Sequence, residues 1–252
     1  MAINKKHPFR KKWGQNFLRD HNTIEKIIGC LNPQKTDHIL EIGPGDGALT
    51  NLLFTKVNLM TVIEIDPLLT SLLKQHSYYN VVIHEKDILN WDLSTIHGRV
   101  KILGNLPYYI SSPILFKMLN WQKWERMVLM FQKELAQRIV ADHGNKSYGR
   151  ISVVVQVYCD VKINFFVSNN VFHPRPDVDS AVLTFTPKEE KLPELQTFSS
   201  LVKRSFSNRR KKIKNNLKEE FKSNKIDKWS NLRAEEISPN EYISLYNSIY
   251  IA

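Results

Sequence analysis

A glycine-rich turn between a buried strand and a helix restricts most strongly how this chain can fold. The apolar run from His38 to Ile42 predicts a buried strand, and a helix is expected from Ala48 to about Thr55. Between them lies Gly43-Pro44-Gly45-Asp46-Gly47. Glycines let the backbone approach a ligand closely, and a helix N-terminus presents free N–H groups. The pattern predicts the nucleotide-binding start of an α/β fold.

Acidic residues lie near the carboxyl ends of the next two predicted strands. The strand Leu59 to Ile65 carries Glu64, which lies about twenty residues beyond the glycines and can bind ribose hydroxyls. The strand Val81 to His84 is followed by Asp87, which can accept from an adenine amino group or cap a turn. Read with Ala48, the turn also fits the dinucleotide fingerprint G-x-G-x-x-A, so a dehydrogenase stays open.

The segment Asn105-Leu106-Pro107-Tyr108 follows an apolar run, Val100 to Leu103, and precedes a helical pattern from Ile114 to Leu119. It therefore lies near the carboxyl end of a strand, where open α/β sheets bind ligands. Asn105 offers a side-chain acceptor, and Pro107 holds Leu106 extended so that its carbonyl can face a ligand. With the flat face of Tyr108, these groups suit a ring bearing an exocyclic amine. The alternative is a proline turn with a buried tyrosine.

The remaining elements are assigned from their patterns. Asp20 or Asn22 can cap a helix reaching about Cys30, with Ile24, Ile27, Ile28 and Leu31 on one face. Before it, Asn16-Phe17-Leu18 reads as a binding motif or as a loop that anchors an aromatic in the core.

Met127 to Phe131 is expected to be a strand and Lys133 to Ala141 a helix. Further β stretches are expected at 151–158, 161–167 and 180–186. Between the last two, the stiff loop Phe172-His173-Pro174-Arg175-Pro176 holds Phe172, which can also be a core aromatic.

Charge points to a polyanionic partner. The chain of 252 residues has a formal net charge of +11 and a pI near 9.5, and nucleic acid is the first candidate. Residues 1–12 read as a flexible basic arm, and 187–191 as a polar linker before a helical, strongly basic block. The basic side chains of that block are Lys203, Arg204, Arg209, Arg210, Lys211, Lys212, Lys214, Lys218, Lys222 and Lys225.

Cysteine use and hydropathy exclude several other classes. The two cysteines, Cys30 and Cys159, form no Cys-x-x-Cys pattern, so neither a disulfide framework nor a zinc site is expected. No apolar run is long enough to span a membrane, and no apolar segment follows the basic N-terminus as in a secretory signal. A cytoplasmic protein without a metal site is predicted.

Taken together, these motifs resemble the ribosomal RNA adenine dimethyltransferases of the KsgA/RsmA family, over nearly the whole chain. The matching stretches are Gly14-Gln15-Asn16-Phe17-Leu18, Glu41-Ile42-Gly43-Pro44-Gly45, Val62-Ile63-Glu64-Ile65-Asp66, Gly104-Asn105-Leu106-Pro107-Tyr108, Ile110-Ser111-Ser112-Pro113, Tyr148-Gly149-Arg150, Phe172-His173-Pro174-Arg175-Pro176, Arg209-Arg210-Lys211-Lys212 and Asn215-Asn216-Leu217.

The resemblance implies a Rossmann-like α/β methyltransferase domain with a mostly parallel seven-stranded sheet over residues 1–187. A small all-α RNA-binding domain would cover 188–252. The implied reaction transfers methyl groups from S-adenosylmethionine to N6 of two adjacent adenosines near the 3′ end of small-subunit ribosomal RNA. The residues implied to bind the cofactor are Asn16, Leu18, Gly43, Gly45, Glu64, Asp87 and Asn105. The residues implied at the target site are Asn105, Leu106, Pro107, Tyr108 and Phe172.

The implied partner is small-subunit ribosomal RNA, or the immature 30S subunit, without an obligate protein partner. Two positions depart from the usual pattern: Tyr109 stands where Asn is common, and His143 replaces a common Pro. An Erm-type methyltransferase acting on large-subunit RNA is the nearest rival, but Leu106 and the run Ser111-Ser112-Pro113 favour the small-subunit enzyme. Other rivals are a non-catalytic RNA-binding assembly or transcription factor and a nicotinamide-dependent oxidoreductase.

Overall fold

The structure is a computed structural model that describes residues 15–220 and 224–251, without the side chains of 224 and 225. The predicted basic arm, Gly14 of the first motif, Lys222 and the side chain of Lys225 lie outside the described residues. The chain divides into two compact units. The first comprises residues 1–133 with 163–184, and the second 134–162 with 185–252. Each unit is described by itself.

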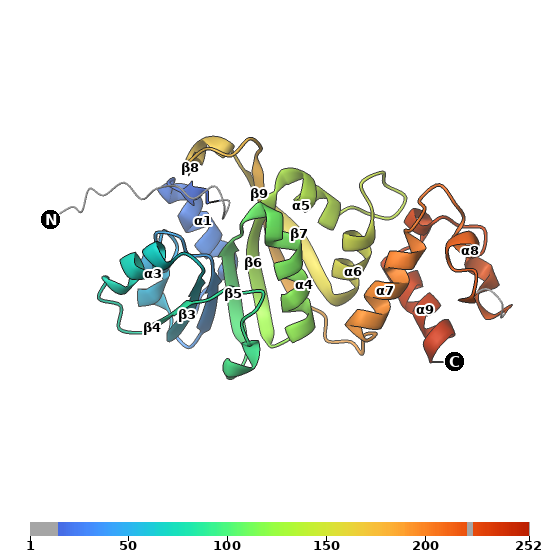
Figure 1. The fold of residues 1–252 in the computed structure, drawn as a ribbon, viewed down its shortest axis with the longest axis horizontal. Helices are drawn as coiled ribbons and strands as arrows, with labels where there is room; N and C mark the ends of the chain where they lie inside the picture. The colour runs from blue at the N-terminus through green and yellow to red at the C-terminus, as the bar shows by residue number, and fades with distance from the viewer. Residues whose placement is uncertain (1–14, 221–223, 252) are drawn as a thin grey trace. The chain divides into compact units, whose positions relative to one another are not determined.

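The chain contains a seven-stranded sheet in the order β4-β3-β2-β5-β6-β9-β7 (Figure 1). Its strands are β2 (His38–Ile42), β3 (Leu59–Glu64), β4 (Val81–Glu85), β5 (Val100–Asn105), β6 (Trp124–Gln132), β7 (Cys159–Val167) and β9 (Ser180–Pro187). The pairs from β4 through β6 are parallel. A short antiparallel pair joins β1 (Phe17–Leu18) to β8 (Phe172–His173). The predicted Rossmann-like α/β class is confirmed.

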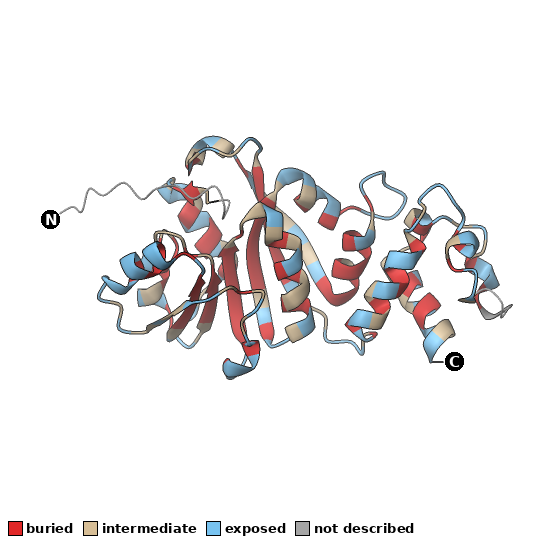
Figure 2. Cartoon of the chain, viewed as in Figure 1, coloured by how far each residue is buried: buried red, intermediate tan, exposed pale blue. Residues whose placement is uncertain are grey.

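The register of the parallel strands gathers the predicted site residues at one edge of the sheet. Ile42 lies opposite Ile63 on β3 and opposite Gly104 on β5. Because parallel strands end at the same edge, Gly43, Glu64 and Asn105 emerge side by side there. The central strands are buried almost throughout (Figure 2), as expected when both faces of a parallel sheet are covered.

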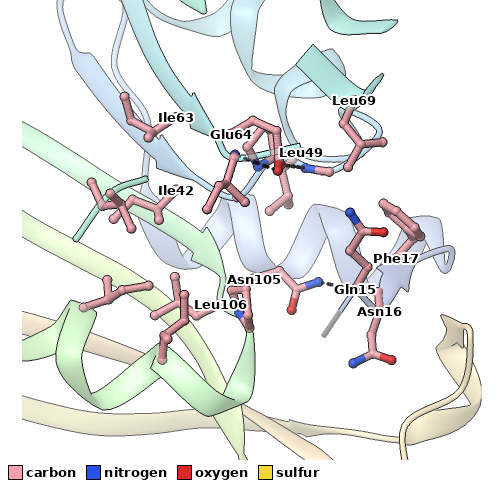
Figure 3. A pocket seen from close by; sticks show the side chains of 18 of the residues that line it. Gln15, Asn16, Phe17, Ile42, Leu49, Ile63, Glu64, Leu69, Asn105 and Leu106 are labelled. Carbon is pink, nitrogen blue, oxygen red and sulfur yellow. Dashed lines mark hydrogen bonds between the residues drawn. The ribbon is translucent and has the colours of Figure 1, made fainter. Parts of the chain in front are cut away.

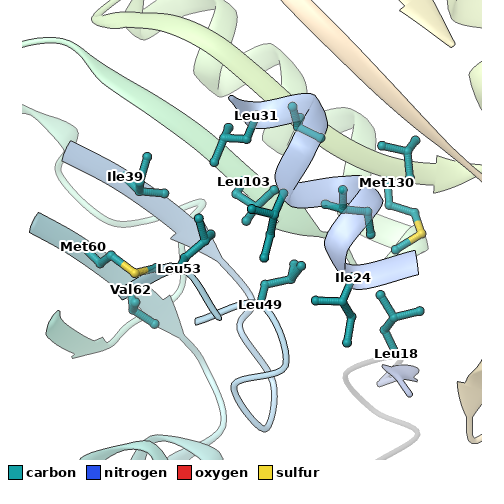
Figure 4. Packing of buried hydrophobic residues seen from close by; sticks show 14 of the residues in the cluster. Leu18, Ile24, Leu31, Ile39, Leu49, Leu53, Met60, Val62, Leu103 and Met130 are labelled. Atoms are coloured by element: carbon teal, nitrogen blue, oxygen red, sulfur yellow. The ribbon is translucent and has the colours of Figure 1, made fainter. Parts of the chain in front are cut away.

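The helices of the first unit are α1 (His21–Leu31), α2 (Thr50–Leu53), α3 (Pro67–Lys74) and α4 (Ser111–Trp121). Asp20 caps α1 by accepting from the Thr23 N–H, which confirms one of the two predicted caps. The predicted apolar face of α1 is buried, and it packs with β-strand side chains such as Leu103 and Met130 in one hydrophobic cluster (Figure 4). The helix predicted from Ala48 is shorter than expected and continues as a 3-10 turn, η2 (Phe54–Lys56).

The β stretch predicted at 151–158 is wrong, because these residues form helix α6 (Arg150–Tyr158). Ser152 starts the helix by accepting from the Gly149 N–H at 3.0 Å and donating to the Arg138 carbonyl at 2.5 Å. The helix is buried nearly all round, so its sequence shows no helical alternation. Its consecutive valines suggested a strand, but tertiary packing overrides that weak preference.

The second unit is helical. Its helices are α5 (Lys133–Ile139, of which Lys133 belongs to the first unit), α6, α7 (Leu195–Ser205), α8 (Ile213–Asn216) and α9 (Pro239–Tyr250), with 3-10 turns η7 (Asn224–Trp229) and η8 (Ala234–Glu236). Buried aromatics join them: the hydroxyl of Tyr148 donates to the Ile237 carbonyl at 2.9 Å, and Tyr242 to Ala234 at 3.0 Å. This unit includes 134–162, whereas the predicted helical domain covers 188–252; that boundary stays a prediction.

Gly104 is required where β5 passes β2. A Cβ atom there would lie 2.7 Å from Leu106 Cδ2 and 3.1 Å from the Ile42 carbonyl oxygen. Leu106 is fully buried and cannot swing aside. We expect Gly104→Ala to lower the free energy of unfolding by about 1–3 kcal/mol. Urea denaturation monitored by circular dichroism measures this.

Gly29 provides the matched control for that substitution. It lies within α1, and a Cβ atom there would meet no atom within 4 Å. Gly29→Ala is therefore expected to raise the free energy of unfolding by about 0.5–1 kcal/mol, since alanine restricts the unfolded chain. Equal stabilities for the two variants would contradict the argument from close packing.

Candidate active site

A pocket opens at the edge of the first unit where β2, β3 and β5 end (Figure 3). It encloses about 960 Å³ of space, part of which is open to solvent. Its lining residues are Gln15, Asn16, Phe17, Leu18, Ile42, Gly43, Pro44, Gly45, Asp46, Ala48, Leu49, Ile63, Glu64, Ile65, Leu69, Lys86, Asp87, Ile88, Asn105, Leu106, Pro107, Tyr108, Tyr109, Ile110 and Ile114.

The glycine turn after β2 forms one wall through its backbone. Gly43 and Gly45 have φ angles of +67° and +62°, in the left-handed region that other residues rarely adopt. A Cβ atom on Gly45 would lie 3.0 Å from the ring of Phe17, which packs directly against the turn. The absence of side chains therefore leaves backbone atoms of the turn accessible at the pocket surface.

Glu64 lies at the end of β3, beside the turn, and is almost completely buried. Its Oε2 accepts from the Gly45 N–H at 3.2 Å, and its Oε1 accepts from the Ile65 and Asp66 N–H groups at 2.9 Å. Burial raises the pKa of Glu64 to about 7, against the lowering effect of these hydrogen bonds. The carboxylate is thus held rigidly at the pocket wall, and its remaining lone pairs can accept from ligand hydroxyls.

The segment after β5 forms the opposite wall. The Asn105 side-chain nitrogen donates to the Asn16 carbonyl at 3.0 Å, which orients the amide and directs its oxygen away from Asn16 (Figure 3). Pro107 is extended, with φ −58° and ψ 125°. The turn is pinned beyond it, because Ile110 N–H donates to the Pro107 carbonyl at 3.1 Å. The proline turn fixes the backbone beside Asn105.

Tyr108 begins the 3-10 turn η4 (Tyr108–Ile110) and is half-buried in the pocket wall. Its hydroxyl pairs with Ser180 Oγ on β9 at 2.6 Å. Its backbone carbonyl accepts from Ser111 Oγ at 2.9 Å. Burial raises the pKa of Tyr108, so the phenol is neutral at ordinary pH and provides a fixed ring face.

Residues 15–18 line a further side of the pocket, and Arg19 follows them directly. Gln15 Nε2 donates to Asp66 Oδ2 at 2.8 Å, next to Glu64, and Arg19 pairs with Asp46 in the glycine turn. Between these contacts the Asn16 carbonyl accepts from Asn105. The segment therefore connects the glycine turn, the end of β3 and the end of β5.

The arrangement has two functional ends. A buried carboxylate and open backbone lie at one end, as ribose recognition requires, and carbonyl acceptors beside an aromatic ring lie at the other. Two ligands can therefore meet above the edge of the sheet. Among the described residues, no group of three or more His, Cys, Asp and Glu side chains is placed to hold a metal ion.

Comparison with known proteins identifies the family. The model of the ribosomal RNA adenine dimethylase family matches residues 6–250. The chain belongs to the ribosomal RNA adenine dimethylase family. It is 41% identical to ribosomal RNA small subunit methyltransferase A of Francisella tularensis subsp. novicida, covering 94% of this chain and 96% of the relative. The protein of the same name from Chlorobium phaeobacteroides is also 41% identical, covering 95% and 93%.

Solved structures agree with this membership. A dimethyladenosine transferase from Plasmodium falciparum superposes with a TM-score of 0.81 at 27% identity, over 91% of this chain and 95% of that one. The 23S ribosomal RNA methyltransferase ErmE superposes with a TM-score of 0.74 at 25% identity, over 93% and 99%. The predicted enzyme class, an S-adenosylmethionine-dependent ribosomal RNA adenine dimethyltransferase, is confirmed by the family.

The structure brings nearly all the predicted site residues of this dimethylase together. The pocket is lined by Asn16, Leu18, Gly43, Gly45, Glu64, Asp87, Asn105, Leu106, Pro107 and Tyr108. Asp87 caps a turn, because its Oδ1 accepts from the Leu89 N–H at 2.8 Å, and it also lines the pocket. Its predicted contact with an adenine amine stays a prediction.

Phe172 is the exception. It does not line the pocket, is only 4% exposed and packs in the hydrophobic cluster of the first unit. It pairs with Leu18 in the short sheet of β1 and β8, which turns it into the core. The structure therefore places Phe172 in the core, and its predicted role as a second stacking face at the target site stays a prediction.

Sequence reasoning missed several lining residues. Gln15 and Phe17 belong to the motif at residues 14–18, yet their contacts with Asp66 and Gly45 depend on long-range packing. Ile65 directly follows Glu64, and Ile88 directly follows Asp87. Both isoleucines line the pocket, as residues near the carboxyl ends of strands often do in open sheets. Tyr109, noted only as a departure from the family pattern, also lines the pocket.

A second buried carboxyl, Glu41, lies beneath the glycine turn. Its Oε2 accepts from Thr50 Oγ1 at 2.6 Å, while its Oε1 has no hydrogen-bond partner among the described residues. Burial raises the pKa of Glu41 to about 7, and the nearby charge of Glu64 adds to the increase. The folded protein thus holds a proton at Glu41 that the unfolded chain releases at lower pH.

We expect this proton to make stability pH-dependent. The folded pKa lies above the unfolded one, so the stabilisation is present at low pH and is lost as pH rises through about 7. Glu41→Gln should remove about 1 kcal/mol of the decline in unfolding free energy between pH 6 and 8. Urea denaturation at pH 6, 7 and 8 tests this, with Glu85→Gln, an exposed carboxylate, as control. Parallel pH profiles for wild type and Glu41→Gln would contradict it.

Proposed function

We propose that this protein dimethylates N6 of two adjacent adenosines in the hairpin near the 3′ end of small-subunit ribosomal RNA, during late 30S assembly. The observation that carries the proposal is the pocket in which Glu64 and the glycine turn share one hollow with Asn105 and Tyr108. The chain's family supplies the reaction class, and the pocket supplies a place for a methyl donor and a target amine to meet.

The small-subunit substrate is supported over the Erm-type alternative. Relatives that are 41% identical over nearly the whole chain are named small subunit methyltransferase A. ErmE, named for 23S ribosomal RNA, is 25% identical. The nicotinamide-dependent rival loses its basis, because the match to the family model extends over residues 6–250 rather than over the glycine turn alone.

The residues present fit S-adenosylmethionine. The glycine turn has no room for a side chain at Gly45, because a Cβ atom there would lie 3.0 Å from the ring of Phe17. Its backbone therefore stays open to a ligand. Three backbone N–H groups hold the Glu64 carboxylate in place at the same wall. Glu64 would accept from the ribose hydroxyls, and Asp87 from the adenine amine. When bound, this cofactor supplies a methyl group on a positively charged sulfur, which is already a good leaving group.

Asn105 and Leu106 would prepare the target amine. The lone pair of an adenine amine is delocalised into its ring, so the amine is a poor nucleophile. The Asn105 Oδ1 and the Leu106 carbonyl would accept its N–H groups, which favours a localised lone pair and directs the nitrogen at the methyl carbon. Positioning and electrostatics carry such catalysis. No general base is required, because the proton can leave after transfer.

Tyr108 would hold the target base once it has left its stack. An adenine in a hairpin must swing out to reach a pocket of this kind. Stacking on an aromatic ring contributes on the order of 1–3 kcal/mol per base. The hydrogen bond to Ser180 fixes the ring of Tyr108, so little side-chain entropy is lost when the base binds.

Exposed cations of the second unit support contact with RNA phosphates. The described basic residues of the block at 203–218 are all exposed, while Ile213 and Leu217 within it are buried. The block is thus a folded cationic surface, the kind that binds phosphates by releasing counterions. No described helix is both long and apolar enough to cross a membrane. We propose the immature 30S subunit as substrate and the cytoplasm as location, with no obligate protein partner.

Mass mapping of methylated adenosines tests the function. The protein is incubated with S-adenosylmethionine and either unmethylated small subunits or free large-subunit ribosomal RNA. We expect two adjacent dimethyladenosines near the 3′ end of the small-subunit RNA and none in the large-subunit RNA. Methylation of the large-subunit RNA alone would favour the Erm-type alternative, and no transfer to either would favour a non-catalytic assembly factor.

A further inference from the structure

The two consecutive tyrosines of η4 have different environments. Tyr108 is half-buried, and its hydroxyl is held by Ser180. Tyr109 is 60% exposed, yet it also lines the pocket. Its ring is therefore at the pocket mouth rather than in the core. The proposed function gives Tyr108 the role of holding the target base and gives Tyr109 no role.

The pocket wall near Tyr109 is apolar and includes one acidic group. Ile88 and Ile114 line the pocket and are buried, and Asp87 lies beside Ile88 at the pocket surface. Lys117 of α4 donates to the Leu89 and Trp91 carbonyls at 2.9 and 2.6 Å. The loop that carries Asp87 is thereby tied to the helix that follows η4.

Tyr109 lines the same pocket as Asp87 and Ile88. Burial and then the negative charge of Asp87 raise the pKa of Tyr109, so the phenol senses the Asp87 carboxylate and stays neutral. A planar ring bound next to Asp87 would cover the exposed face of Tyr109 on one side and Ile88 on the other. Burial of that aromatic surface against a flat heterocycle would stabilise the complex.

We propose that Tyr109 is a cofactor-binding residue that covers the purine of S-adenosylmethionine at the pocket mouth and slows its release. The inference rests on the proposed function for the identity of the cofactor. The target adenosine lies on the side of Tyr108 and Asn105, so the two neighbouring tyrosines serve different ligands. In relatives with asparagine at this position, the purine would lack this cover.

Calorimetry on the full chain without RNA tests this role. Tyr109→Asn should raise the Kd of S-adenosylhomocysteine about tenfold, as loss of one stacking face predicts. Tyr109→Phe keeps the ring and should stay within about twofold of wild type. Tyr79→Asn, which removes a tyrosine that is 73% exposed and does not line the pocket, should leave the Kd unchanged. Thermal unfolding of each variant checks that it is folded.

A shorter ligand locates the effect within the cofactor. 5′-Methylthioadenosine keeps the purine and ribose but lacks the amino acid end, so Tyr109→Asn should weaken both ligands by the same factor. In methylation assays, the KM for S-adenosylmethionine should rise about tenfold, while kcat and the KM for RNA stay near wild-type values.

Several results would overturn the proposal. An unchanged Kd with an increased KM for RNA would assign Tyr109 to the nucleic acid. An equal loss in Tyr109→Phe would assign the effect to the hydroxyl and not the ring. Failure of the proposed function is distinguishable, because a wild-type chain that binds S-adenosylhomocysteine but methylates no ribosomal RNA leaves the binding comparison intact. A wild type that binds neither cofactor form overturns both.

Discussion

Replacing Asn105 with alanine is expected to lower the rate of methyl transfer by about 100-fold or more, while the affinity for S-adenosylmethionine weakens only a few fold. The Asn105 oxygen would accept an N–H of the target amine, and this contact gains strength as positive charge develops on the nitrogen. Removing one such preorganised group from an active site typically costs about 100- to 1,000-fold in rate. Single-turnover transfer of a tritiated methyl group, with calorimetric titration of the cofactor, measures the two effects separately.

The Asn105 side chain also holds residues 15–19, so the substitution needs a control for loosening of that segment. Its nitrogen donates to the Asn16 carbonyl, and alanine removes this bond too. Gln15→Ala removes the neighbouring bond to Asp66 but leaves the Asn105 oxygen in place. We expect Gln15→Ala to affect mainly cofactor binding. Activity of Asn105→Ala within a few fold of wild type, or an equal rate loss in Gln15→Ala, would contradict the assigned role.

Local patterns were sufficient for the part of the fold that positions the site. His38–Ile42 is a strand with the predicted bounds, and the glycine turn follows it as expected. Asp20 caps α1 with the predicted apolar face buried. These features depend on short-range chemistry: hydrophobic runs, glycine conformations and side-chain caps. Because parallel strands end at one edge, the sequence positions of Glu64 and Asn105 were enough to predict that they meet.

The wrong strand prediction at 151–158 has a physical cause, which is burial on more than one side of the element. Residues 151–158 form a helix that is covered nearly all round, so neither helical nor strand alternation is visible in its sequence. An aromatic side chain in a stiff, proline-containing loop can face a ligand or the core with the same local sequence. The pairing of Phe172 with Leu18 places this ring in the core, and its predicted contact with the target base stays a prediction.

Long-range contacts also account for the lining residues that the sequence did not reveal. Phe17 is 6% exposed and packs on Gly45, which is distant in sequence. No periodicity encodes such a contact. The same holds for Tyr109, whose neighbour Tyr108 is turned inward by a bond to Ser180 on a different strand. Sequence patterns located the pocket walls, and tertiary packing decided which side chains form them.

The second large effect is expected at Glu64, where Glu64→Gln should raise the Kd for S-adenosylmethionine by roughly 10- to 150-fold. This corresponds to about 1.5–3 kcal/mol for one lost hydrogen bond to a charged group. The glutamine has the same shape, but its NH₂ group cannot accept from the N–H groups of Gly45, Ile65 and Asp66 or from a ribose hydroxyl. Isothermal titration at pH 8 measures the change.

Glu85 is the matched control, because it lies directly opposite Glu64 in the β3–β4 register but is exposed and does not line the pocket. Glu85→Gln removes the same charge from the neighbouring strand and should leave the Kd unchanged. If the two variants bind equally, only the overall charge matters, and the role of Glu64 as a ribose acceptor is wrong.

The pH dependence of binding gives a second, independent test of Glu64. Because burial raises its pKa to about 7 in the free protein, a substantial fraction of Glu64 is protonated at pH 6 and unable to accept through both oxygens. Ribose hydroxyls favour the charged form, so cofactor binding must release that proton at low pH. Wild-type affinity should therefore fall as pH decreases from 8 to 6, and Glu64→Gln should lose this dependence. An affinity profile that is the same in both proteins would show that another group titrates.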